Sequence, residues 1–73
     1  MAADTLGRIY FHKGVYNTAL VYLKIAVDKG PTPSRQFHLA MTYLKSGDHN
    51  SGQKLLMAAL REDPDLAKKE QGW

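Results

Sequence analysis

The chain has 73 residues, of which 44% are hydrophobic and 23% charged, with a formal net charge of +3 and no cysteine. This composition is typical of one small folded domain, and the lack of cysteine excludes disulfides and thiolate metal sites. The sequence holds no apolar stretch of the ~18 residues that a membrane span requires. Its start has no hydrophobic region typical of a signal peptide. We therefore expect one domain over residues 1–73, cytoplasmic by default.

Helical periodicity predicts four helices and a short fifth one. Their expected ranges are about Ala2–His12, Val15–Lys29, Ser34–Ser46, His49–Glu62 and Asp65–Gln71. Gly14 and Gly47 follow the first and third helices, where a left-handed C-terminal cap favours glycine. Thr32 and Asp48 are the predicted N-caps of the third and fourth helices, and Pro33 fits a first helical turn. No run of alternating β-branched residues indicates a strand.

The chain resembles itself when it is shifted by 33 residues. Leu6 then falls on Leu39 and Tyr10 on Tyr43. Six further pairs match in the same order: Gly7/Ala40, Gly14/Gly47, Ala19/Gly52, Leu23/Leu56, Ala26/Ala59 and Pro31/Pro64. Self-similarity at such a period indicates repeated units that stack on one another. The small residues of these pairs are expected to let neighbouring helices approach closely, and the large ones to fill the space beside them.

The order of these residues resembles the tetratricopeptide repeat, a helix-turn-helix unit whose usual period is 34 residues. The resemblance covers about residues 3–65. It implies an all-α fold in which antiparallel helix-turn-helix repeats stack as a short right-handed α-solenoid. Repeat one is expected over about 2–31, repeat two over about 33–64, and a capping helix over about 65–73.

Some positions depart from the family pattern. Its opening tryptophan is replaced by Ala3 in the first copy and Gln36 in the second, and Gly52 stands where the family prefers alanine. Glycine inside a helix costs ~1 kcal/mol relative to alanine. The residue missing from the usual period is expected in the connection over residues 31–34. With eight matched positions in a fixed order, the resemblance stands despite these departures.

The sequence shows no arrangement typical of catalysis or metal binding. His12, His38 and His49 lie on different predicted elements without the i,i+4 spacing of a helical metal site, and we expect them to be partly exposed surface residues. No nucleophile is paired with a base. Lysine and arginine are spread among acidic residues, unlike the concentrated positive face of a nucleic-acid-binding protein. We expect no enzyme activity, no cofactor or metal, and no nucleic-acid or membrane partner.

The family resemblance implies protein–protein interaction through a concave groove that the first helix of each repeat lines. The groove residues carried over by alignment are Asp4, Arg8, Phe11, His12, Phe37, Met41, Leu44 and Lys45. Alternatively, Phe11 and Leu44 cover the gap between adjacent first helices, and both interpretations can hold. The family's carboxylate clamp for chaperone tails uses lysine and asparagine. It is not expected here, because the matching places hold Asp4, Arg8 and His38 and a third full repeat is missing.

The second predicted helix is apolar almost all round, which favours burial on more than one side. Val21 and Ile25 stand where the family usually places polar residues, and Ile9 extends the apolar surface. A self-associating assembly unit, a homodimer that pairs this patch with its copy, is the alternative function. A fragment of a longer repeat scaffold protein would also explain the patch, as would isolated surface hydrophobes without a role.

The last residues resemble the start of a third repeat that stops early. Leu66 and Trp73 are spaced i,i+7 and would share one helical face, with polar residues between them. A terminal helix of this kind protects the last apolar face of a repeat array and is polar outside. We expect a capping helix here.

Overall fold

The computed structural model describes residues 2–70 and contains five α-helices in this part of the chain. They are α1 (Ala3–His12), α2 (Tyr16–Lys29), α3 (Pro33–Ser46), α4 (His49–Glu62) and α5 (Leu66–Lys69). The prediction of an all-α fold is confirmed, since residues 2–70 form no strand. The four long helices begin and end within one residue of their predicted bounds. Helix α5 is shorter than predicted, and Gln71 and Trp73 lie outside the described residues.

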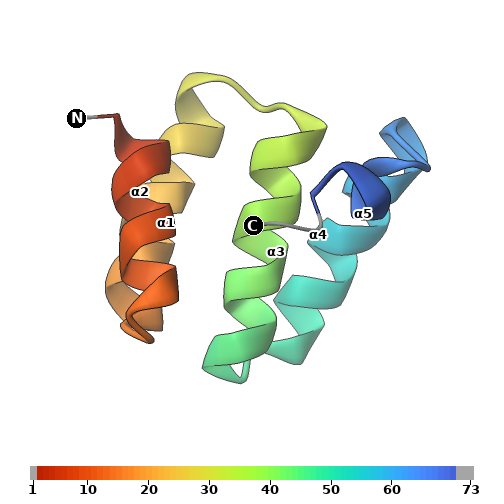
Figure 1. Ribbon diagram of the computed structural model, residues 1–73. Coiled ribbons are helices and arrows are strands. Elements are labelled where there is room, and N and C mark those ends of the chain that lie inside the picture. The colour runs from red at the N-terminus through yellow and green to blue at the C-terminus, as the bar shows by residue number, and fades with distance from the viewer. Residues whose placement is uncertain (1, 71–73) are drawn as a thin grey trace.

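The helices form two hairpins that pack side by side (Figure 1). The α1–α2 pair lies at the left of the figure and the α3–α4 pair at the right, with α2 packed against α3 between them. Helix α5 contacts both α3 and α4. Helices α1 and α3 also contact each other, so the first helices of the two hairpins flank one face of the molecule.

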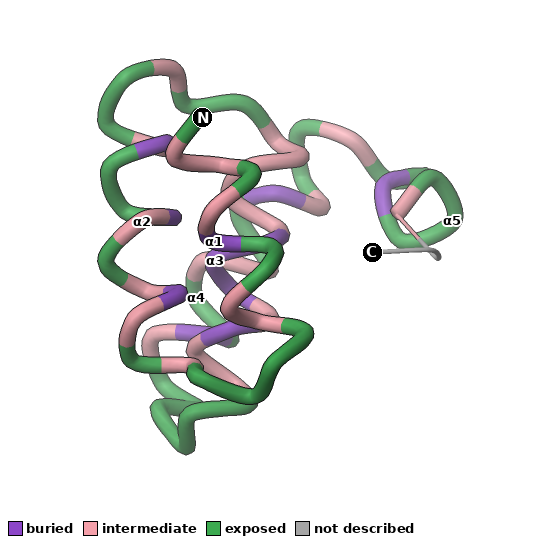
Figure 2. The backbone as a smooth tube through the Cα atoms, turned by 60° about the vertical axis from the view of Figure 1, so that its left-hand side comes forward, coloured by how far each residue is buried: buried purple, intermediate pink, exposed green. Residues whose placement is uncertain are grey.

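The core is built on small residues where helices meet. All six of the small residues predicted to allow close approach are buried: Gly7, Ala19, Ala26, Ala40, Gly52 and Ala59. A Cβ atom added at Gly7 would lie 2.5 Å from Cγ of Leu23, so a side chain at this position requires Leu23 to shift. Figure 2 shows these buried stretches in purple along the inner sides of the helices.

The turns that close the two hairpins have the same geometry. Gly14 and Gly47 have φ angles of +79° and +99°, the left-handed conformation predicted for them. After α1, Gly14 N–H donates to the carbonyl of Phe11 and Val15 N–H to that of Tyr10, which is a Schellman motif. The same pair of bonds recurs one repeat later after α3. The repeat in sequence is therefore a repeat in local backbone structure.

The predicted N-caps of α3 and α4 are confirmed. The side chain of Thr32 accepts a hydrogen bond from Arg35 N–H, and that of Asp48 accepts one from Ser51 N–H, each at 3.2 Å. Such caps satisfy backbone donors that have no partner within the helix. They fix the residue at which each helix begins.

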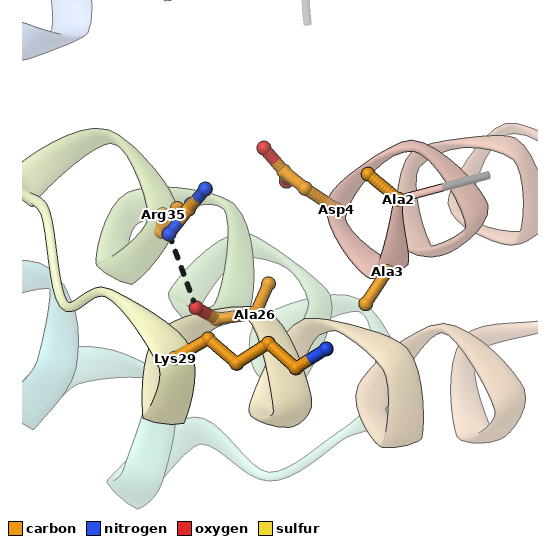
Figure 3. A pocket seen from close by; sticks show the side chains of 6 residues that line it. All are labelled: Ala2, Ala3, Asp4, Ala26, Lys29 and Arg35. Atoms are coloured by element: carbon orange, nitrogen blue, oxygen red, sulfur yellow. Dashed lines mark hydrogen bonds between the residues drawn. The ribbon is translucent and has the colours of Figure 1, made fainter.

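Arg35 links the two hairpins at one end of the molecule (Figure 3). Its Nη1 donates to the carbonyl oxygen of Gly30 at 2.9 Å and to that of Ala26 at 3.4 Å. The cation thus satisfies the last carbonyls of α2, where the helix dipole also favours positive charge. A cavity of about 120 Å³ lies here between the start of α1, the end of α2 and Arg35.

An Asp-Pro-Asp turn leads from α4 into α5. Asp63 Oδ1 accepts a hydrogen bond from Asp65 N–H at 3.2 Å, as expected of an aspartate in a turn. Asp63 Oδ2 lies 2.8 Å from Lys69 Nζ, and this hydrogen bond lowers the pKa of Asp63 and raises that of Lys69. Leu66 is 2% exposed and anchors α5 on the core.

Candidate functional site

A shallow cavity of about 240 Å³ lies between α1, α3 and the residue that follows α5. We call it the α1–α3 cavity, and its lining residues are Asp4, Thr5, Arg8, His38 and Glu70. Two of them, Asp4 and Arg8, are predicted groove residues. The cavity therefore lies on the face where the sequence predicts partner binding, and its lining is mostly polar and charged.

His38 lies at the centre of this lining and is only 6% exposed. The prediction that it is a partly exposed surface residue is wrong, although His12 and His49 are exposed as expected. His38 is buried because α1 approaches its side of α3 and Glu70 closes over it. Its Nε2 lies 2.9 Å from Glu70 Oε2, and its Nδ1 lies 3.7 Å from Asp4 Oδ1. The imidazole thus stands between two carboxylates from opposite ends of the chain.

Glu70 is held by two side chains of α3. Ser34 Oγ donates to Glu70 Oε1, and His38 Nε2 bonds to Oε2. Burial by itself would raise the pKa of Glu70, but the hydrogen bonds from Ser34 and His38, with the charges of His38 and Arg8, bring that pKa below its ordinary value. Glu70 is therefore ionised at neutral pH. Because an ionised carboxylate only accepts hydrogen bonds, Nε2 of His38 must carry the proton.

The sequence repeat contains a signal for this cluster. Residues 4, 37 and 70 are equivalent under the 33-residue shift, and His38 follows the middle one. Phe37 is the residue before His38. Asp4 and Glu70 therefore occupy the positions equivalent to Phe37, one repeat earlier and one repeat later. The repeat relates Asp4 to Glu70, whereas His38 joins them only through its tertiary contacts.

The other predicted groove residues do not line the α1–α3 cavity. Phe11 is half-buried and meets the ring of Tyr16 edge-on, with the ring centroids 5.5 Å apart. Leu44 packs toward α4, since its Cγ would lie 2.7 Å from a Cβ added at Gly52. Phe37 and Met41 are half-buried on α3. The remaining two residues, His12 and Lys45, are exposed.

The three residues of the predicted self-association patch are exposed: Ile9 by 36%, Val21 by 56% and Ile25 by 39%. Ile9 stands two residues after Gly7, about 200° round the helix from the contact with α2. Thr42, its equivalent on α3, is completely buried. The difference arises because α2 packs against α3, whereas no helix of the described chain packs on that side of α1.

A prediction on pH follows from the contacts of Glu70. Its folded-state pKa is lower than in the unfolded chain, so its contribution to stability is present above the ordinary glutamate pKa of about 4.3 and is lost as the pH falls through the folded value. We expect Glu70→Gln to lower stability by about 1 kcal/mol at pH 7 and to flatten the acid-side decline, as measured by urea unfolding between neutral and acid pH.

The control is Glu62→Gln, which removes the same charge at an exposed position on α4. Its acid-side decline should run parallel to that of the wild type. Equal pH profiles for both variants would show that the bonds to Ser34 and His38 do not stabilise the fold.

Residues 2–70 contain no group of three or more histidine, aspartate, glutamate or cysteine residues placed to hold a metal ion. None of the helices in this part of the chain is long and apolar enough to cross a membrane. No protein-family model, no curated protein and no solved structure matches the chain. Its function has to be argued from its own residues.

Proposed function

We propose that the chain is a protein–protein interaction module of the tetratricopeptide kind. Its two hairpins would be the repeats over about 2–31 and 33–64, and a partner peptide would bind along α1 and α3. The 33-residue repeat supports this proposal, because its small residues and turn glycines recur in the same places. A chain built from two equivalent hairpins offers their equivalent faces to a partner.

The observation that carries the proposal is the α1–α3 cavity. It lies between the two helices that are equivalent in the repeat, and its lining contains an arginine, a histidine and two carboxylates. Phe37 and Met41 lie half-buried on the same helix as His38, outside the cavity lining, and add apolar surface to α3. Polar groups beside partly exposed aromatic and methionine side chains are typical of recognition surfaces.

The experiment is a selection of random peptides displayed on phage against the purified chain, followed by affinity measurements on the selected peptides. We expect Phe37→Ser combined with Met41→Ser to weaken binding at least tenfold while far-UV circular dichroism stays unchanged. Arg8→Ala should also lower the association rate and its salt dependence, because exposed charges steer encounters.

The matched control is Met57→Ser, which replaces a 59% exposed methionine on α4, outside the α1–α3 cavity. It should leave the affinity of the selected peptides unchanged. Binding that Met57→Ser abolishes and the α3 variants spare would place the partner on α4 and overturn the proposal.

A further inference from the structure

One carboxylate is already bound on the α1–α3 face, and it belongs to the chain itself. Each oxygen of Glu70 has its own donor, Ser34 Oγ for Oε1 and His38 Nε2 for Oε2. Ser34 and His38 are spaced i,i+4 on α3, so their side chains lie one turn apart on one face of the helix. This arrangement recognises a carboxylate with both oxygens, which fixes its orientation as well as its position.

The donors of this site are firmly held. Helix α3 has 14 residues and packs against both α2 and α4. The imidazole of His38 is buried, and Asp4 Oδ1 lies 3.7 Å from Nδ1, on the side of the ring opposite Glu70. Arg8 lines the same cavity and adds a positive charge beside the carboxylate.

Glu70, the acceptor, lies at the end of a much shorter helix. Helix α5 has four residues, and Glu70 follows its last residue. Leu66 anchors the start of the helix in the core, and the Lys69–Asp63 pair lies near the surface. An exposed ion pair contributes little to stability. Glu70 can therefore leave its donors without disturbing the packing of the four long helices.

We propose that Ser34, His38 and Arg8 form a binding site for a carboxylate of an acidic peptide partner, and that Glu70 fills this site in the free protein as an internal competitor. The inference rests on the proposed function for its premise that the α1–α3 face binds a peptide. Affinity for the partner is then reduced by the fraction of molecules whose site is open. A site closed by Glu70 in nine molecules of ten binds about tenfold more weakly than the open site.

The experiment measures binding of a fluorescein-labelled pentaglutamate peptide by anisotropy, with pentaglutamine as the neutral probe. We expect Glu70→Ala to bind pentaglutamate about tenfold more tightly than the wild type, with Glu70→Gln as a second variant if the first folds poorly. The double variant Ser34→Ala with Glu70→Ala should lose this gain. Pentaglutamine should bind all of these proteins equally weakly.

Glu62→Ala is the matched control, because it removes one negative charge from the exposed surface of α4 and leaves the site intact. If Glu62→Ala and Glu70→Ala strengthened pentaglutamate binding equally, the change in net charge alone would explain the effect. That result would overturn the inference. Failure of pentaglutamate to bind any variant would also overturn it, while peptides selected through Phe37 and Met41 would leave the proposed function standing. Tightening by Glu70→Ala without any selectable peptide would contradict the proposed function and keep the carboxylate site.

Discussion

Leu23→Ala is expected to destabilise the domain by about 2–5 kcal/mol, as large-to-small core substitutions do. Leu23 is 1% exposed and packs against Gly7, so its removal leaves a cavity between α1 and α2. A core of this size supplies only ~3–5 kcal/mol of stability. The variant should therefore lose its cooperative thermal transition by circular dichroism, or melt far below the wild type.

The repeat provides a matched control at Leu56, which occupies the equivalent position in the second hairpin but is only half-buried. Leu56→Ala should lower the free energy of unfolding clearly less than Leu23→Ala does, although the substitution and the position within the repeat are the same. Equal losses would show that the second hairpin buries its core residues as completely as the first.

Gly52→Ala is expected to destabilise the fold by up to about 2 kcal/mol even though alanine is the better helix former. The added Cβ would lie 2.7 Å from Leu44 Cγ and 3.0 Å from the carbonyl oxygen of Ala40. The backbone oxygen cannot turn away as the end of a side chain can, so α3 and α4 must separate. Overpacking of this kind costs ~1–3 kcal/mol, which exceeds the gain of ~1 kcal/mol in helix propensity. Urea unfolding measures the net change in the free energy of unfolding.

Ala58→Gly on the same helix calibrates the propensity term, because residue 58 is exposed. This variant should lose ~1 kcal/mol through helix propensity alone. If Gly52 had no role in packing, Gly52→Ala would instead raise the free energy of unfolding by as much as Ala58→Gly lowers it. That result would contradict the close approach of α3 and α4.

The sequence by itself determined the helices, the turns and the small residues at the helix contacts. These features depend on neighbours a few positions away: Thr32 and Asp48 cap helices within three residues, and Gly14 and Gly47 close a hairpin within one turn. Both copies of the repeat carry the turn glycines, whereas Ala2 and Val15, the N-caps of α1 and α2, make no side-chain cap hydrogen bond. Asp4 and Arg8, which the family resemblance implies as groove residues, line the α1–α3 cavity.

Only the tertiary structure decided which equivalent residues are buried and which charges meet. Leu23 is buried and Leu56 half-buried, and Thr42 is buried while Ile9 is exposed, because the inner helices have neighbours on both sides and the outer ones on one. His38 meets Glu70 across 32 residues of sequence, a contact that no local pattern specifies. The position of a helix in the stack, rather than its sequence, determines what covers each of its faces.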